Sequence, residues 1–388
     1  MKAQVILFLY SLLMVSCIAK DSSELNLKKV IDYEAINIKS PITFTPNRDY
    51  KWSIAHFNNN SLLVRMSSTA DELLINTLNL DSLSVHPTIK IPAQGPNGYR
   101  SSSPIVHYHS PDSIYVLTTS INEIIRYDRK GDKKELTKIQ YDFPLSLDSN
   151  EDQQSFFIAD NSIYGYAVPY LNPNNKNFFD KAFRYIQVDL SNGNVIGNPY
   201  PADLSGKILP TDFLGGHTIQ INDSIYLYND YRSHKVKVIN RKTSIEKDVI
   251  MGFEELEEFK PGTKPINNAD LEKVLMVIRH PKYYSILYDR RNNLIYRFTQ
   301  FLNPKYNNLS DKALLEELSK NNMDLIKNAV IVSDIGFTKT VRFEIDRHDF
   351  YAPFKDGLLT PSYSESDLSS EEFYFYDLAE IIAELKTP

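Results

Sequence analysis

The stretch INDSIYLYND, Ile221–Asp230, places a polar turn at Asn222 and Asp223 before a run that mixes apolar and polar residues. Nearly the same pattern occurs at SPDSIYVL, Ser110–Leu117, and again at IADNSIYGY, Ile158–Tyr166. In each case one short strand ends in the polar turn and a second strand begins on Ser-Ile-Tyr. Alternation around turn residues of this kind predicts a β-hairpin. A chain that contains one hairpin several times is expected to be built from structural repeats.

The repeated unit has four strands, here named a to d in chain order. Strands c and d follow the three hairpins in EIIRYDRKGDKKELTKI, FRYIQVDLSNGNVIG and KVKVINRKTSIEKDVI. Looser copies of the unit begin at Trp52–Met66 and Tyr283–Phe298. A last copy, Phe350–Tyr363 with Glu371–Leu378, has strands a, b and c before a short helical tail. The strand predicted at Leu27–Ile38 has no unit of its own and can supply the missing strand d.

These repeats predict an all-β fold, a six-bladed β-propeller of four-stranded antiparallel blades in which the N-terminal strand completes the last blade. Radial repetition of small sheets leaves only short, protected edges. Aromatic residues make up 12% of the 388 residues and only 13 are glycine, a composition that suits strands. Seven blades or a pair of sandwiches remain alternatives, because two of the six copies rest on pattern rather than on shared residues.

One short inserted helix is predicted within the largest insertion, Phe301–Asn328. Ser310 can cap this helix, and Leu314, Leu315 and Leu318 form one apolar stripe along it. The stripe indicates either a helix packed on the edge of the propeller or a helix that binds a partner. We favour packing, because exposed apolar stripes are costly.

The N-terminal stretch MKAQVILFLYSLLMVSC predicts a secretion signal, because Lys2 precedes an apolar run, Val5–Val15, that is too short to cross a bilayer as a helix. Its end, LMVSC, resembles the bacterial lipobox, and Cys17 is the only cysteine of the chain. Cys17 is therefore the predicted lipidation site, with an ordinary signal peptide and an incidental cysteine as the alternative. The predicted organisation is a lipoprotein signal peptide at residues 1–16, a lipidated tether at 17–25 and a single propeller domain at 26–388. The expected location is the outer membrane of the bacterial cell envelope, with the periplasmic or surface orientation left open.

Charge and motifs exclude several classes of function. The net charge is -6 and the basic residues are scattered, so no nucleic-acid partner is expected. The sequence has no glycine-rich phosphate loop, no H-E-x-x-H and no G-x-S-x-G. It therefore predicts no cofactor and no catalytic residue.

The lipobox, YYSILYDRRNNLIYRF and the late KDGLLTPSY together resemble the Bacteroidota lipoproteins grouped as domain-of-unknown-function 4221. The resemblance covers nearly the whole mature chain. It implies a six-bladed propeller of the TolB-like or NHL-like kind. Because the family has no settled activity, the resemblance transfers no functional residue.

Loop lengths predict a ligand site on one rim of the propeller. The a–b and c–d turns are tight, whereas the b–c and d–a connections are long and open on the same rim, where binding residues usually lie. The candidate ligand-binding residues on this rim are Arg100, His217, Tyr231, Arg232 and Arg297. Together they would form a cationic and aromatic mouth for an anionic sugar or a peptide carboxylate. The alternative is that the arginines bridge neighbouring blades.

Three other groups of residues allow a functional interpretation. His107 and His109 point to one face of a strand and could share a metal, but the sequence marks no third ligand, so no metal site is predicted. Loop residues such as Asn172 and Phe179 are expected to be exposed and could bind carbohydrate, whereas most tyrosines fall at strand positions and are expected to pack between blades. Arg290 and Arg291 lie on the opposite, a–b rim and are interpreted as solvated turn residues.

The leading functional hypothesis is a lipid-anchored binding protein of the cell envelope, whose ligand is a protein, a peptide or a carbohydrate. The first alternative is a metal-dependent hydrolase of the lactonase or esterase type, with a divalent cation held in the central channel. That chemistry needs carboxylates on the inner strands, which are poor in acids. The second alternative is a structural subunit of an envelope assembly.

Overall fold

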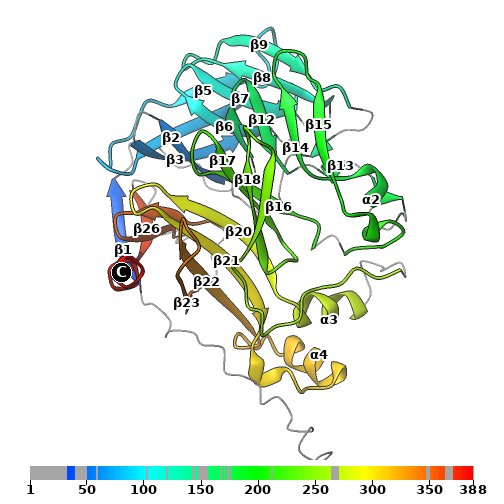
Figure 1. The fold of residues 1–388 in the computed structure, drawn as a ribbon. Coiled ribbons are helices and arrows are strands. Elements are labelled where there is room, and N and C mark those ends of the chain that lie inside the picture. The colour runs from blue at the N-terminus through cyan, green and yellow to red at the C-terminus, as the bar shows by residue number, and fades with distance from the viewer. Residues whose placement is uncertain are drawn as a thin grey trace, which may run out of the picture.

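The three quoted hairpins are the inner strand pairs of three four-stranded sheets in the computed structural model (Figure 1). The structure describes residues 33–39, 50–57, 60–101, 104–118, 121–141, 145–146, 156–166, 168–169, 171–172, 175, 177–210, 213–263, 271–346, 350–362 and 370–387. Within these ranges the sheets are six antiparallel blades arranged as a propeller, as the sequence predicted. The predicted signal peptide, Cys17 and the tether lie outside the described residues.

Each blade orders its strands from the axis outward. Blade one is β2 (Tyr50–Phe57), β3 (Asn60–Ser68), β4 (Glu72–Asn79) and β5 (Ile89–Pro92); blade two is β6 (Ile105–Ser110), β7 (Ser113–Thr118), β8 (Glu123–Tyr127) and β9 (Lys133–Lys138). Blade three is β11 (Phe156–Ala159), β12 (Ser162–Gly165), β14 (Phe183–Asp189) and β15 (Val195–Pro199); blade four is β16 (Gly216–Gln220), β17 (Ile225–Asp230), β18 (Lys235–Asn240) and β19 (Ile245–Ile250). Blade five is β20 (Lys282–Asp289), β21 (Leu294–Leu302), β22 (Ile326–Asp334) and β23 (Thr340–Glu344). A separate two-stranded sheet joins β10 (Leu145–Ser146) and β13 (Val168–Pro169).

Blade six is closed by the N-terminal strand, which confirms the predicted closure. Its inner strands are β24 (Ala352–Phe354), β25 (Gly357–Pro361) and β26 (Ser370–Asp377), and β1 (Tyr33–Lys39) is the outermost. β1 pairs antiparallel with β26 along its whole length, from Tyr33 opposite Tyr376 to Lys39 opposite Ser370. The first and last strands of the domain therefore share one sheet, which joins the two ends of the ring (Figure 1).

The third strand of each blade ends in, or is directly followed by, an Asp or Asn whose side chain accepts a hydrogen bond from the backbone N–H two residues ahead, or four residues ahead in blade five. These residues are Asn79, Asp128, Asp189, Asn240, Asp334 (here the N–H four residues ahead) and Asp377. Short polar side chains of this type stabilise tight turns, because they replace a backbone acceptor. In five blades the turn leads into strand d. In blade six the Asp377 side chain instead accepts from Ala379 at the start of helix α5 (Ala379–Lys386), the predicted helical tail.

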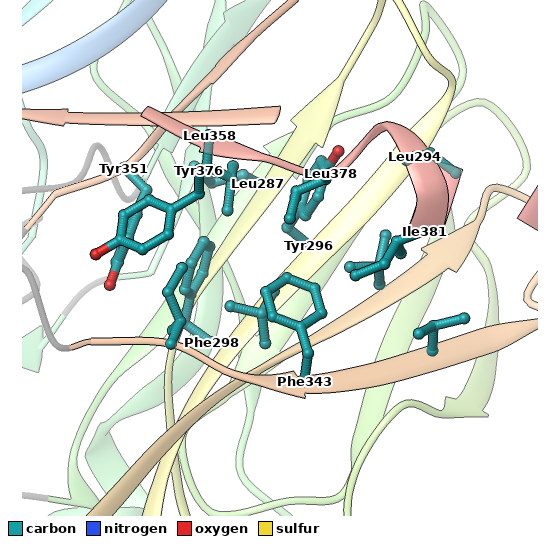
Figure 2. Packing of buried hydrophobic residues seen from close by; sticks show 14 of the residues in the cluster. Leu287, Leu294, Tyr296, Phe298, Phe343, Tyr351, Leu358, Tyr376, Leu378 and Ile381 are labelled. Carbon is teal, nitrogen blue, oxygen red and sulfur yellow. The ribbon is translucent and has the colours of Figure 1, made fainter. Parts of the chain in front are cut away.

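Neighbouring blades pack through large apolar side chains. Between blades five and six, Tyr296, Phe298 and Phe343 meet Tyr351, Leu358 and Tyr376, and Leu378 and Ile381 extend the contact to α5 (Figure 2). The rings of Phe298 and Tyr351 stack at a centroid distance of 4.5 Å. Tyrosines form a second interface between blades three and four, where Tyr164, Tyr185, Tyr226 and Tyr228 cluster. Most tyrosines therefore belong to the core.

The long connections carry more helix than the sequence predicted. Besides the predicted α4 (Asp311–Ser319), which Ser310 caps by accepting from the Ala313 N–H, the described residues include α2 (Phe178–Lys181) and α3 (Leu271–Arg279). Two short 3-10 helices are η2 (Ala202–Leu204) and η4 (Pro304–Tyr306). Leu314 is buried in a cluster shared with α3, so α4 packs against the propeller. This is the alternative that the sequence analysis favoured for the helix. None of the helices in the described ranges is long and apolar enough to cross a membrane.

Candidate functional site

The two ends of the propeller differ in how much chain they carry. One end, here called the turn face, carries the short a–b and c–d turns of the blades. The other, here called the connection face, carries the b–c and d–a connections with α2, α3 and α4. These connections share a buried core of their own, formed by Phe178, Phe179, Ala182, Tyr200, Leu204, Leu209, Phe213, Leu214 and Phe259. Phe179 is buried and stacks edge-on against Tyr200, so the expectation that it is an exposed carbohydrate contact is wrong.

The structure brings four of the five predicted site residues together on the connection side of blades four and five. His217 is fully buried, and its ring lies edge-on to that of the buried Tyr231 at 5.7 Å. Arg232 pairs with Asp230 at 2.7 Å and lies over the ring of Tyr200. Arg100 is separate and exposed, in the connection between blades one and two, with a positive φ of 56°. A ligand site at these residues stays a prediction.

Arg297, the last of these four residues, is fully buried and joins blade five to blade four. Its Nε donates to Asn229 Oδ1 at 2.7 Å, and its terminal nitrogens donate to backbone carbonyls of blade four, including those of His234 and Met251. The guanidinium also lies 3.9 Å from the ring centre of Tyr283. This arginine bridges neighbouring blades, which is the alternative that the sequence left open, but its bonded partners are carbonyls rather than carboxylates.

A cavity of about 150 Å³ lies on the propeller axis and opens toward the turn face. All six blades contribute to its wall. Its lining residues are Ile54, Ala55, His56, His107, Tyr108, His109, Phe156, Phe157, Ile158, Thr218, Ile219, Gln220, Ile286, Leu287, Tyr288, Arg290 and Phe350. Phe156, Thr218 and Phe350 are 1% exposed and form the floor, whereas His109 and Arg290 are exposed at the mouth.

Three histidines line this cavity, and two of them are the pair noted in the sequence. The rings of His107 and His109 stack at 6.0 Å, which confirms that they share one face of β6. Burial, aided by the neighbouring His109, lowers the pKa of His107 to about 3. Burial also lowers the pKa of His56 to about 3, with a further contribution from the charge of Arg290. These imidazoles are therefore neutral at neutral pH, so they offer hydrogen-bonding groups without charge.

Arg290 is a cavity residue that sequence reasoning placed among solvated turn residues. It directly follows β20, at the turn-face end of that strand, and lines the cavity. None of the ion pairs between described residues involves Arg290, although the charge of Asp223 acts on it from a distance. The lining residues include no Asp or Glu, and no three His, Cys, Asp or Glu in the described ranges are placed to hold a metal ion. The cavity can thus bind the apolar group of a ligand next to the positive charge of Arg290.

Residues 24–208 match the family model of the domain of unknown function DUF4221. The DUF4221 match spans β1 and blades one to three, and it confirms the family resemblance stated from the sequence. No curated protein matches the chain.

Two solved structures share the propeller fold. A DUF4221 member from Bacteroides vulgatus has a TM-score of 0.66 at 16% identity, over 91% of this chain and 98% of that chain. A protein from Bacteroides fragilis, named as a candidate exported protein, has a TM-score of 0.52 at 10% identity, over 89% of this chain and 97% of that chain. At these identities the likeness establishes the fold.

Proposed function

We propose that this chain is an exported, lipid-anchored protein of the bacterial cell envelope that binds a ligand in its central cavity. The observation that carries this proposal is the cavity of about 150 Å³, to which all six blades contribute and which has polar side chains at an exposed mouth. A mostly apolar cavity with a few convergent polar groups is the common form of a ligand site. We therefore propose a ligand site at the turn face, whereas the sequence predicted one at the connection face.

The alternative, a metal-dependent hydrolase of the lactonase or esterase type, has less support. A divalent cation such as calcium needs several oxygen ligands, most of them carboxylates. The polar residues of the wall are three imidazoles, Tyr108, Tyr288, Thr218, Gln220 and Arg290. A cation would lie next to a guanidinium there, without a carboxylate to offset the repulsion. Binding is therefore the function that the cavity supports best.

The binding proposal is tested with the purified chain lacking residues 1–17. Ligand-observed NMR with a fragment library would identify binders, and each binder would be measured again on two blocked variants. Ala55→Phe fills the cavity from a buried wall position, and Gln220→Trp covers the mouth from a half-buried one. Fragments that bind the parent and lose binding to both variants are expected. Absence of binders, or binders that both folded variants still bind, would overturn the proposal.

Export and anchoring are supported by the apolar N-terminal run, by Cys17 as the only cysteine, and by the name of the Bacteroides fragilis relative. Expression in a Bacteroides host with labelled palmitate would test this part. We expect label and membrane association for the parent chain, and neither for Cys17→Ser. An unlabelled parent chain would remove the lipid anchor and leave the cavity proposal intact.

A further inference from the structure

The charge of the central cavity is concentrated at one residue. Of its lining residues, Arg290 alone carries a permanent charge. The floor is apolar, with Phe156 and Phe350, and His107 lies deep in the wall with 7% of its surface exposed. A ligand that enters therefore meets a cation at the mouth and apolar side chains below it.

Three carboxylates on the turns around this mouth are engaged elsewhere, and Asp356 on the turn of blade six forms none of the ion pairs between described residues. Asp112 pairs with Arg129 at 2.7 Å, and Asp160 pairs with Arg241. Asp289, which precedes Arg290, accepts from the Asn292 side chain and from backbone N–H groups of its own turn. Asp223 is exposed, and its charge acts on Arg290, but the two form no ion pair. The Arg290 guanidinium is thus available for an anion from solution.

The size of the cavity limits the apolar part of the ligand. An apolar cavity of roughly this volume, ~150 Å³, accommodates a benzene ring. Drug-sized ligands need about 300 Å³ or more. The wall therefore fits one aromatic ring or a short alkyl chain, and the rest of the ligand must be small enough to remain at the mouth.

From this geometry we infer that the cavity binds a small monocarboxylic acid, with its apolar group against the floor and its carboxylate at Arg290. The inference rests on the proposed function and specifies its ligand class. A guanidinium forms two parallel hydrogen bonds with a carboxylate, which orients the ligand as well as attracting it. The same charge disfavours amines, because repulsion is strong next to an apolar wall. Neutral analogues keep the apolar contacts and lose only the ionic one.

The test uses four probes on the chain lacking residues 1–17: benzoate, hexanoate, benzamide and benzylamine. We expect at least one acid to bind, benzamide to bind about tenfold more weakly than benzoate, and benzylamine not to bind. Arg290→Gln should weaken binding of the acid by about tenfold or more. The matched control is Arg291→Gln, which makes the same charge change on the next, exposed residue and should alter the affinity by less than about twofold.

The outcomes separate this inference from the proposed function. If benzamide binds as tightly as benzoate, or if both arginine variants weaken the acid equally, the Arg290 anchor is wrong while cavity binding stands. If neither acid binds but other fragments bind and are lost in the blocked variants, the ligand class is wrong and the proposed function stands. If no fragment binds in the cavity, both the inferred ligand class and the proposed function are wrong.

Discussion

Arg297 shows how a single residue can join two blades without a partner of opposite charge. Its guanidinium is fully buried and bonds to Asn229 and to carbonyls at the end of β17, the start of β18 and the end of blade four. Burial lowers the pKa of Arg297 to about 10, so it remains charged at neutral pH. A planar group with five donors can serve several carbonyls at once, which a lysine cannot do.

We expect Arg297→Met to lower the free energy of unfolding by about 3 to 5 kcal/mol, because it removes the donor from buried acceptors such as Asn229 Oδ1 and the Met251 carbonyl. Arg297→Lys should recover only part of the loss, since an ammonium cannot reach all of these acceptors. Urea unfolding followed by tryptophan fluorescence would measure both. Arg291→Met, at an exposed turn of the same blade, is the control and should stay within about 0.5 kcal/mol of the parent. A loss for Arg297→Met no larger than the control's would contradict the structural role.

Buried histidines make the stability of the fold depend on pH. Burial lowers the pKa of His56, His107 and His217 to about 3 in the folded chain. The ordinary value in an unfolded chain is about 6.5. Below that value the unfolded chain binds protons that the folded chain does not, so stability falls as pH drops from about 6.5 toward 3.

Each of these histidines should add at most about 1.4 kcal/mol of lost stability per pH unit across that range. Urea unfolding at about pH 7, 6 and 5 would give the slope. His107→Gln should make the slope shallower by up to that amount, whereas His86→Gln, at an exposed position, should leave it unchanged. Identical slopes for the parent and His107→Gln would show that His107 takes up its proton equally in both states.

At the scale of strands and turns, the blades contact one another through glycines in two equivalent turns. Gly131 and Gly193 lie in the c–d turns of blades two and three, both with positive φ, +78° and +76°. A Cβ at these positions would lie 2.0 Å from the Lys90 carbonyl oxygen and 1.8 Å from that of Lys138. Each turn therefore rests on the outermost strand of the preceding blade, where only glycine fits.

Gly193→Ala is expected to destabilise the chain by more than about 2 kcal/mol, because it combines a left-handed conformation with a clash against backbone. Gly95→Ala separates these two effects. Gly95 also has a positive φ, +88°, but nothing lies within 4 Å of a Cβ there. Gly95→Ala should therefore lower the free energy of unfolding by only about 1 to 2 kcal/mol. Equal losses in thermal or urea unfolding would show that the contact between blades contributes nothing.

The strands were predictable from the sequence because their signals are local. Alternation and turn residues identify a hairpin within about ten residues. The Asp or Asn that ends each third strand, from Asn79 to Asp377, is an equally local signal that could have supported the two looser copies. Helix α3 was missed because its segment was interpreted as part of a long connection. The core of the connections was missed because it joins side chains from separate blades, such as Phe179 and Phe259, whose proximity no single segment reveals.

At the scale of the whole molecule, closure of the ring depends on β1. Removing it would expose the outer edge of β26 along seven paired residues and open blade six. An unpaired strand edge promotes association with other chains.

We expect a chain of residues 40–388 to have a lower melting temperature than one of residues 26–388, and to self-associate at higher protein concentration. A synthetic peptide of residues 26–39 should restore part of the stability when added in excess, since it binds only the folded form. Differential scanning calorimetry and analytical ultracentrifugation would measure the two effects. Equal melting temperatures with and without residues 26–39 would show that the ring is stable without its closing strand.

The candidate cavity could not be predicted from the sequence, because it forms only when the six blades close into a ring. Its lining comes from the inner strand segments of six blades, from Ile54 to Phe350, and only the closed ring brings them together. Long loops pointed instead to the connection face, where the structure places packed aromatic residues. The histidine pair on β6 was visible in the sequence, but its neighbours across the axis, Gln220 and Arg290, were not.

The position of β1 also sets how the propeller would face a lipid surface. Tyr33 begins β1 opposite Tyr376, at the turn-face end of blade six. Residues 18–32 separate that point from Cys17, and their fully extended length is about 50 Å. An acyl anchor at Cys17 would therefore attach to the propeller at the end that carries the mouth of the cavity, with at most about 50 Å of chain between that end and the bilayer. A ligand that partitions into the membrane would have an aqueous path no longer than about this tether between the bilayer and that end of the propeller.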